Sequence, residues 1–468
     1  MEDSLVVSEA SEIKEVSAQN NALLKFDPEI TKSLLDVSIE QADIWSAPDI
    51  DKREYIRSIF AYPAMMIPAV QDLLISKVKE HQKNISSLFD PYMGGGTSLI
   101  SGMYHGLDCF GQDINPLSIL LSKVKTGPLL PNEFNVAALQ VVKEARADKS
   151  TSIDIYFPGL TKWFNSDVAL ELSKLRNAIK RINCIYSRRY LWITLAEAIR
   201  LSSNDRTSTF KMHARPRHQT LDRFISPIEL IEAFNVKNIE DILSFQEELK
   251  DRNYLNKNST YTGEINIALL DSKSSIIRHP SNLKFDLLVS SPPYGDNATT
   301  ITYGQFAFLP LQWIDLNDID VDIDSKLLET ISAIDNKSLG GDFKNILNAD
   351  RLYNISPTLK KIVAQIKDST KKVDNYNKVI SFFSDFEASL VRIVESLNQN
   401  AYMIWTIGNR RVNKIEVPND KILIEILKSL DCTYLTTLNR QILNKRMPTR
   451  NNITELMADE QIVIMRKN

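Results

Sequence analysis

Apolar residues follow two spacings along this chain, and the change between them predicts an α/β fold interrupted by insertions. Short apolar runs typical of buried strands alternate with helical spacing over residues 87–113, and again from residue 264 onward. Between residues 128 and 260 helical spacing dominates. Alternating strands and helices are typical of a doubly wound α/β sheet. We therefore expect one such sheet with a large, mostly helical insertion and a second, smaller insertion.

The expected elements come in three groups. The first group is a helix over residues 64–79, begun by Pro63 and interrupted by Pro68, then a strand (87–89), a helix (98–105) and a strand (108–112). The insertion contributes helices over residues 136–147, 168–182, 190–201 and 228–251. The last group is two strands (265–270, 285–290), a helix (382–397), a strand (401–407), a helix (421–429) and two strands (433–438, 461–465).

These elements predict a division of the chain into six segments. They are an N-terminal tail (1–50), a catalytic domain's first half (51–127), the helical insertion (128–261), the second half of the catalytic domain (262–312), a second insertion (313–380) and a C-terminal part that completes the sheet (381–468). The tail is polar, with weak periodicity and at most one short helix expected.

Composition narrows the class of protein. The 468 residues are 43% hydrophobic and 25% charged, which is ordinary for a soluble globular protein. The three cysteines are widely spaced, so we expect no disulfide framework and no zinc site, in keeping with a cytoplasmic location. No run of 18 apolar residues and no signal peptide is found, so no membrane association is expected. The net charge of −3 leaves room for a local basic cleft.

Candidate chemistry begins where the first strand ends. The run Asp90-Pro91-Tyr92-Met93-Gly94-Gly95-Gly96-Thr97 follows that strand, the usual ligand position in an open α/β sheet. Its glycines allow close approach of the backbone to a ligand, and Thr97 or Ser98 can cap the next helix. Asp113 ends the following strand, where a carboxylate can accept hydrogen bonds from both ribose hydroxyls. We expect Asn115-Pro116 to turn the chain away. A glycine triplet alone is equally typical of a plain loop, and the GxGxxG of a dinucleotide site is absent.

A second loop carries groups suited to an exocyclic amine. Ser291-Pro292-Pro293-Tyr294 follows the apolar strand at residues 285–290. The Ser291 hydroxyl and the Pro292 carbonyl can accept the two N–H bonds of an amine, and the two prolines stiffen the loop. Tyr294 offers a ring face to a base taken out of its stack. Groups of this kind act by orientation rather than as a strong base. In isolation the same four residues would also suit a turn with a packing tyrosine.

The two loops together resemble those of the DNA amino-methyltransferases that use S-adenosylmethionine. Phe89 to Thr97 resembles the family's FxGxG-type cofactor loop, and Ser291 to Tyr294 its (S/T/D)PPY loop. The resemblance covers roughly residues 55–126, 262–312 and 380–468. It implies a Rossmann-like class I methyltransferase sheet. A serine at the head of the second loop is more similar to cytosine-N4 enzymes than to adenine-N6 enzymes, which usually have Asp. The cofactor loop comes first here, whereas many cytosine-N4 enzymes have the reverse order.

The resemblance also implies a set of site residues. Tyr62, before Pro63-Ala64, resembles the segment that closes the cofactor pocket, and Asp271 lies where the family often has an acid near the adenine. The expected cofactor-binding residues are Tyr62, Asp90, Pro91, Met93, Gly94, Gly96, Thr97, Asp113, Ile114 and Asp271. The expected catalytic residues are Ser291, Pro292, Pro293 and Tyr294. No metal is expected, because methyl displacement from a sulfonium needs none.

The helical insertion is the candidate target-recognition region. Between residues 188 and 223 it contains Arg188, Arg189, Arg200, Arg206, Lys211, Arg215, Arg217 and Arg223. Arginine and lysine contacts to phosphates would position double-stranded DNA. The predicted DNA-binding residues are Arg206, Lys211, Arg215, Arg217, Arg410, Lys445 and Arg446. A solvated helix face is the alternative for the basic run. The acidic residues Asp318, Asp320, Asp322 and Asp324 lack the glycine and glutamate of an EF-hand, so a solvated loop is expected there.

The sequence thus predicts a site-specific DNA cytosine-N4 methyltransferase that acts on a flipped-out base. Three alternatives stay open: an adenine-N6 DNA methyltransferase, an RNA guanine-N2 methyltransferase and a non-catalytic DNA-binding subunit. Expected partners are double-stranded DNA and, in a restriction-modification setting, a cognate restriction nuclease or other defence-system subunits.

Overall fold

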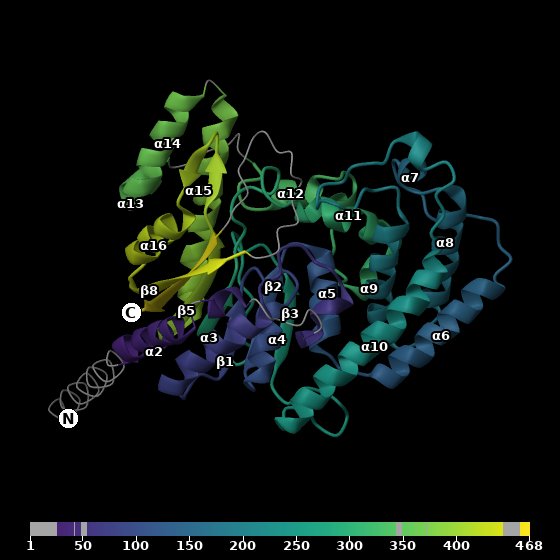
Figure 1. The fold of residues 1–468 in the computed structure, drawn as a ribbon, viewed down its shortest axis with the longest axis horizontal. Helices are drawn as coiled ribbons and strands as arrows, with labels where there is room; N and C mark the ends of the chain where they lie inside the picture. Colours follow the sequence, from purple (N-terminus) through teal and green to yellow (C-terminus); the bar gives the residue numbers. More distant parts are fainter. Residues whose placement is uncertain (1–25, 42, 48–53, 343–348, 371, 443–458) are drawn as a thin grey trace, which may run out of the picture.

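The fold is that of a computed structural model, which describes residues 26–41, 43–47, 54–342, 349–370, 372–442 and 459–468. A seven-stranded sheet lies at its centre (Figure 1). The strands are β1 (Ser87–Asp90), β2 (Asp108–Asp113), β3 (Ile265–Leu269), β4 (Phe285–Ser290), β5 (Leu397–Gly408), β8 (Cys432–Gln441) and β9 (Asp459–Lys467). Their order is β3-β2-β1-β4-β5-β9-β8. β3, β2, β1, β4 and β5 run parallel, and β9 pairs antiparallel with β5 and β8. This confirms the predicted Rossmann-like sheet.

The order of the strands reverses between β1 and β4. β1 pairs with β2 on one side and with β4 on the other, with Leu88 opposite Leu287 and Phe89 opposite Leu288. In an open α/β sheet such a reversal leaves a crevice at the carboxyl ends of the two strands, because their connections leave toward opposite sides. The two loops singled out in the sequence follow these two strands.

Alternation along each strand divides the core into two apolar clusters, one on each face of the sheet. Leu88, Leu287 and Ile404 belong to one cluster, whereas their chain neighbours Phe89 and Leu288 belong to the other. Successive side chains of a strand point to opposite faces, so strands buried on both faces read as continuous apolar runs.

Each face is covered by its own set of helices. The first is covered by α3 (Pro68–His81), α4 (Thr97–Tyr104) and α5 (Pro116–Thr126). The insertion helices α6 (Pro131–Ala147), α8 (Ser166–Lys180), α9 (Ile185–Ser202) and α10 (Pro227–Asp251) continue the same apolar cluster beyond them. The other is covered by α14 (Pro357–Ser369), α15 (Val373–Ser396) and α16 (Asn419–Ser429). Further elements are α2 (Phe26–Glu40), α7 (Leu160–Trp163), α11 (Tyr303–Trp313), α12 (Ala333–Lys337), α13 (Ala349–Ile355) and the hairpin of β6 (Arg410–Val412) and β7 (Ile415–Val417).

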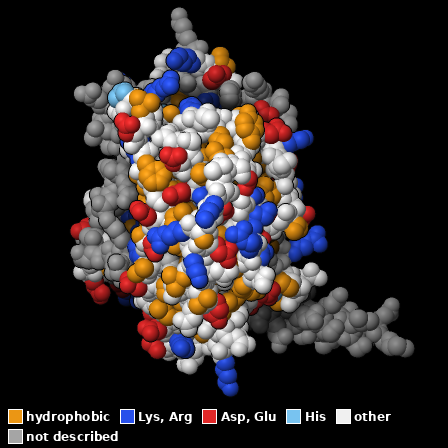
Figure 2. Space-filling view, turned by 90° about the vertical axis from the view of Figure 1, so that its right-hand side faces the viewer, with side chains coloured by type: hydrophobic (Ala, Val, Ile, Leu, Met, Phe, Trp, Pro, Cys, Tyr) orange, Lys and Arg blue, Asp and Glu red, His pale blue; other side chains and the backbone are white. Residues whose placement is uncertain are grey.

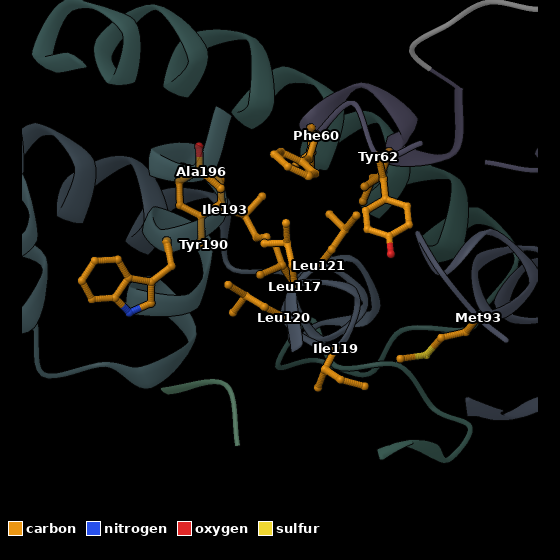
Figure 3. Packing of buried hydrophobic residues seen from close by; sticks show 14 of the residues in the cluster. Phe60, Tyr62, Met93, Leu117, Ile119, Leu120, Leu121, Tyr190, Ile193 and Ala196 are labelled. Atoms are coloured by element: carbon orange, nitrogen blue, oxygen red, sulfur yellow. The ribbon is translucent and has the colours of Figure 1, made fainter. Parts of the chain in front are cut away.

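Helix α5 is one of the elements through which the helical insertion joins the rest of the molecule. Figure 3 shows Leu117, Leu120 and Leu121 of α5 between α9 on one side and the segment of Phe60 and Tyr62 on the other. All three leucines are fully buried. The insertion therefore packs on the catalytic sheet through a continuous apolar core.

Four local expectations are corrected. The first helix begins at Pro68, at the first helical position where proline's missing N–H costs nothing, and not at residue 64. Asn115-Pro116 does not turn the chain away, because the Asn115 side chain caps α5 and Pro116 begins it. Helix α15 begins at Val373, nine residues before the predicted 382. The β6–β7 hairpin was not predicted, since each of its strands has only three residues.

The acidic run after α11 is not a plain solvated loop. Asp318 is buried and accepts a bidentate pair of hydrogen bonds from Arg188, each 2.8 Å long, and a third from the Trp192 indole at 2.7 Å. The backbone carbonyl of Asp318 accepts from Arg189. The first two residues of the predicted basic run therefore bind the second insertion instead of facing outward.

No helix among the described residues is long and apolar enough to cross a membrane.

Candidate active site

A pocket lies at the carboxyl ends of β1, β2, β3 and β4 and encloses about 850 Å3, its open mouth included. Its walls contain residues of the Asp90 loop, of the end of β2, of the segment after β3 and of the Ser291 loop. Gly94 and Asp113 on one side and Ser291 and Pro293 on the other line the same space. The two loops singled out in the sequence therefore meet at one edge of the sheet.

Asp90 is the anchor between the two loops, although it does not line the pocket. Its carboxylate is fully buried and accepts hydrogen bonds from the Ser290 hydroxyl at 2.6 Å, the Ser98 hydroxyl and the Tyr92 backbone N–H. Burial raises the pKa of Asp90 to about 6, against the opposing effect of these three hydrogen bonds. Asp90 was predicted to contact a ligand, but it fixes the end of β1 to the end of β4.

Helix α5 supports the glycine loop through one face. Ser118, Ser122 and Lys125 are spaced so that they share that face, and they meet three consecutive glycines. The Ser118 hydroxyl donates to the Gly94 carbonyl, and Lys125 Nζ donates to the Gly95 carbonyl at 2.8 Å. A Cβ on Gly96 would lie 2.8 Å from Ser122 Oγ, and the φ of Gly96 is +73°. Gly96 therefore takes the cap position before α4, and its role is to turn the backbone away from the pocket, not to line it.

Asp113 closes the glycine loop from the opposite side. Its two carboxylate oxygens accept from the Gly94 N–H at 2.9 Å and the Asn115 N–H at 2.8 Å. Burial raises the pKa of Asp113, while these backbone hydrogen bonds lower it. The residue lines the pocket, and the two oxygens of a carboxylate can accept about four hydrogen bonds in all. The side chain can therefore hold the loop and accept ligand hydroxyls together.

Most of the predicted cofactor-binding residues line this pocket. They are Tyr62, Pro91, Met93, Gly94, Thr97, Asp113, Ile114 and Asp271. Tyr62 is held by its ring stacking on Tyr303, with centroids 6.0 Å apart, and by the Asn115 amide, which donates to its hydroxyl at 3.2 Å.

The Ser291 loop is tied to the far strands by a polar chain. The Tyr294 hydroxyl donates to Glu460 Oε1 at 2.9 Å and lies 3.4 Å from Ser291 Oγ. Glu460 in turn pairs with Arg440 at 3.2 Å. The Tyr294 hydroxyl hydrogen is used in the hydrogen bond to Glu460, so Ser291 is the donor to Tyr294. The lone pairs of Ser291 Oγ therefore stay free toward the pocket. Pro292 is buried and, like Tyr294, does not line the pocket.

Arg410 is corrected as a predicted surface contact for DNA. Its side chain is only 6% exposed. Arg410 Nη1 donates to Asp296 Oδ2 at 2.9 Å and to Thr299 Oγ1 at 3.0 Å. A Cβ on Gly295 would lie 2.1 Å from the same Nη1, so only glycine fits beside it. Arg410 therefore sets the course of the loop after Tyr294, and its guanidinium does not face outward.

The predicted basic segment of the insertion packs directly on this loop. Lys211 Nζ donates to the Ala298 carbonyl at 3.2 Å, and the Thr302 hydroxyl donates to the Phe210 carbonyl at 3.2 Å. Among the other predicted DNA contacts of this segment, Arg206 and Arg217 are exposed and Arg215 is half-buried. Lys445 and Arg446 lie outside the described residues.

The helical face of the molecule carries both signs of charge. Figure 2 shows Lys and Arg side chains mixed with Asp and Glu on the side of the insertion helices. Any nucleic-acid interface is therefore a local feature, as the net charge of −3 indicates.

Several pocket residues carry no sequence signal of their own. Asn297, Tyr303, Ile334, Ser338 and Leu339 line the pocket, and Asn297 follows Ser291 by six residues. Helix α12, which contains Ile334, belongs to the second insertion, and Ser338 and Leu339 follow it directly. Only the polar Asp296-Asn297 after Tyr294 could have drawn attention to this part of the wall.

Two known proteins resemble the chain. It is 31% identical to Type II methyltransferase M.MvaI from Kocuria varians over 438 residues, which are 89% of this chain and 92% of that protein. It is 29% identical to Type II methyltransferase M.MjaII from Methanocaldococcus jannaschii over 75 residues, 16% of this chain and 14% of that protein. No family model matches the chain, and no solved structure gives a significant match.

Proposed function

Because this chain belongs to the type II methyltransferase family, we propose that it transfers a methyl group from S-adenosylmethionine to cytosine N4 in double-stranded DNA. One observation carries the proposal. The glycine loop after β1 and the Ser291 loop after β4 follow adjacent parallel strands and line one pocket. A methyl donor and an amine acceptor must be brought within contact distance, and this juxtaposition provides for it.

The pocket residues fit the methyl donor. Asp113 offers its carboxylate to ribose hydroxyls, and Asp271 offers a second carboxylate farther along the same edge. Gly94 and Gly95 let the backbone lie close to the ligand, and Tyr62 and Met65 cover them. When bound, S-adenosylmethionine supplies an electrophilic methyl on a sulfonium. The protein's part is to hold it, to exclude water and to aim the acceptor.

Ser291 is the side chain that we expect to bind the target amine. An exocyclic amine has its lone pair delocalised into the ring, so acceptors on its N–H bonds favour the pyramidal, nucleophilic form. The Ser291 hydroxyl donates a hydrogen bond to Tyr294 and keeps its lone pairs to accept one from an N–H group of the amine. The second N–H is assigned to the backbone carbonyl of Pro292, a residue whose ring is buried beside the pocket-lining Ser291 and Pro293.

Cytosine is our choice of base because serine heads the loop. Adenine N6 is the nearest alternative, since the same two acceptors suit its amine. An RNA guanine-N2 enzyme and a non-catalytic DNA-binding subunit are the remaining alternatives. Intact acceptors at Ser291, Asp113 and the glycine loop favour an active enzyme.

DNA is the proposed substrate because basic side chains lie next to the Ser291 loop. Lys211 binds that loop directly, and Arg206 and Arg217 are exposed on the same segment. Phosphate contacts here would place a duplex so that a flipped-out base enters the pocket. We further propose that the modification protects a recognition site from a cognate restriction nuclease.

The test is transfer of labelled methyl groups to duplex DNA, duplex RNA and single strands, followed by mass spectrometry of the nucleosides. We expect N4-methylcytosine from duplex DNA. Ser291→Ala should lower kcat at least a hundredfold and leave binding of S-adenosylhomocysteine unchanged, because Ser291 contacts the amine and not the donor. Ser150→Ala, at an exposed serine, is the control.

Each other outcome of this assay has a defined meaning. N6-methyladenine would contradict the choice of base, and N2-methylguanine in RNA would contradict the substrate. Full activity of Ser291→Ala would remove Ser291 from the mechanism. A wild-type protein that binds S-adenosylhomocysteine but methylates none of the substrates would favour the DNA-binding subunit.

A further inference from the structure

Asn297 places a buried amide on the wall of the pocket. Its side chain is 3% exposed and lines the same space as Gly94, Ser291 and Tyr303. Asn297 Nδ2 donates to Asp335 Oδ1 at 3.0 Å. Asn297 Oδ1 has no hydrogen-bond partner among the residues that the structure describes. A buried carbonyl oxygen without a donor is rare in proteins, and on a residue that lines a pocket it indicates a ligand group.

The orientation of this amide is fixed by Asp335. The Asp335 carboxylate also accepts from the backbone N–H groups of Gly304 at 2.8 Å and Gln305 at 3.2 Å, at the start of α11. Rotating the Asn297 amide by half a turn would bring its oxygen against that carboxylate and lose the hydrogen bond. The free group is therefore the oxygen, an acceptor, and the ligand group that it awaits is a donor.

Asp335 itself has no room to move. A Cβ on Gly304 would lie 2.9 Å from Asp335 Cγ and 2.9 Å from its backbone nitrogen. Burial raises the pKa of Asp335, which favours the neutral acid. The hydrogen bonds from Asn297, Gly304 and Gln305 lower the pKa and favour the carboxylate. A carboxylate that accepts from three N–H groups behind the amide makes Asn297 Oδ1 a stronger acceptor and favours a cationic donor.

The neighbours of Asn297 connect it to the glycine loop. Tyr303, next to Gly304, accepts through its carbonyl from the Asn115 amide, which also binds the Tyr62 hydroxyl. Asn115 in turn donates its backbone N–H to Asp113, the residue that holds Gly94. Asn297 thus shares the pocket with the glycines, against which the amino-acid end of the methyl donor would lie.

We propose that Asn297 Oδ1 accepts a hydrogen bond from the α-ammonium group of the methyl donor, with Asp335 as its positioning residue. This inference rests on the proposed function and deepens it, because it assigns one subsite of the cofactor. The two N–H bonds of the target amine already have acceptors in Ser291 and Pro292. An ammonium group has three N–H bonds and a positive charge, and the oxygen backed by a carboxylate suits it.

The experiment is a binding cycle by titration calorimetry with two probes and two proteins. The probes are S-adenosylhomocysteine and its analogue without the α-amino group. The proteins are the wild type and Asn297→Leu, which keeps the branched shape of the side chain and removes its amide group. We expect the wild type to bind the analogue about tenfold more weakly than the parent, and Asn297→Leu to bind both with nearly equal affinity.

Asp335→Asn provides a second variant that keeps the shape of the wall. It removes the carboxylate that fixes the amide, so the preference for the amino group should fall toward that of Asn297→Leu. Asp322→Asn, at an exposed residue of the same insertion, should keep the full preference. Circular dichroism and thermal unfolding establish that each variant is folded.

The outcomes separate this inference from the function on which it rests. An unchanged preference for the amino group in folded Asn297→Leu overturns the inference and leaves the enzyme a methyltransferase. Loss of methyl transfer in Asn297→Leu with the preference intact would assign Asn297 to the target base, and it too overturns the inference. If the wild type binds neither probe, the proposed cofactor is wrong and both conclusions fall.

Discussion

Lys125 illustrates at the scale of single residues how the site uses buried ionisable groups. Its side chain is 1% exposed, and its Nζ donates to the Gly95 carbonyl beneath the pocket. Burial is the main cause that lowers the pKa of Lys125 to about 7, with the nearby Arg57 adding to it. The sequence gives no signal for this residue, because a lysine on a helix is normally solvated.

The lowered pKa predicts how stability depends on pH. Below about pH 7 Lys125 is charged in both the folded and the unfolded state, so the folded protein bears the full free-energy penalty of burying the ammonium group. Between pH 7 and 10.5 the folded protein loses the proton first, so unfolding takes up a proton and this group's contribution to stability rises with pH. Lys125→Met should therefore have a higher free energy of unfolding than the wild type, and the difference should be largest at pH 6.5. The advantage should shrink by a few kcal/mol toward pH 10, at about 1.4 kcal/mol per pKa unit.

Urea unfolding at pH 6.5, 8 and 9.5 measures this difference. Lys143→Met, at an exposed position of α6, should show no such trend. A Lys125→Met difference that stays constant with pH would mean that Lys125 is charged throughout this range in the folded protein.

The contact between α9 and the segment after α11 shows what decides the arrangement of whole elements. Arg188 and Trp192 lie one helical turn apart on α9, and both bind the buried Asp318. Burial raises the pKa of Asp318, but the hydrogen bonds from Arg188 and Trp192 outweigh it and hold the pKa below its ordinary value. Its contribution to stability is present above the unfolded pKa and is lost as the pH falls below it.

Asp318→Ala should lower the free energy of unfolding by about 2–4 kcal/mol at pH 7, because it leaves a guanidinium and an indole N–H without their acceptor. Asp322→Ala, four residues on and exposed, should change it by less than about 0.5 kcal/mol. Chemical unfolding of both variants is the measurement. Equal stability of the two would show that the second insertion is held by apolar packing alone.

At the scale of the whole molecule, the sheet order brings the functional segments together. β1 and β4 are about 200 residues apart in sequence and adjacent in the sheet, with the helical insertion connecting on one side. The insertion returns its segment at residues 205–215 to the loop after Tyr294, through Lys211 and Phe210. The same molecule thus presents a pocket and an exposed basic edge next to one another.

This arrangement predicts the salt dependence of DNA binding. Replacing Arg206 and Arg217 by Gln removes two exposed charges from the segment whose Lys211 binds the loop after Tyr294. The slope of log K against log[salt] should fall by about 1.8, at roughly 0.9 for each lost phosphate contact. The slope is measured by fluorescence anisotropy with a duplex oligonucleotide, over a range of roughly 50 to 200 mM salt.

Lys143 and Lys149, both exposed at the far end of the insertion, give the matched control when changed to Gln. This double variant should have the same slope of log K against log[salt] as the wild type. A slope that the arginine pair leaves unchanged would exclude this segment as a phosphate-binding surface.

The sheet and two central residues of the site could be predicted from the amino-acid sequence. Strands buried on both faces have continuous apolar runs, and chemistry in such a fold lies where strands end, so Asp113 and Ser291 could be identified from their positions. Which polar groups act on the ligand and which act on the protein could be read only from the folded chain. Asp90, Arg410 and Asp318 satisfy partners inside the fold, whereas Asn297 keeps a free oxygen in the pocket. Hydrogen bonds between residues more than a hundred positions apart leave no pattern in the sequence, because their geometry exists only once the strands have paired.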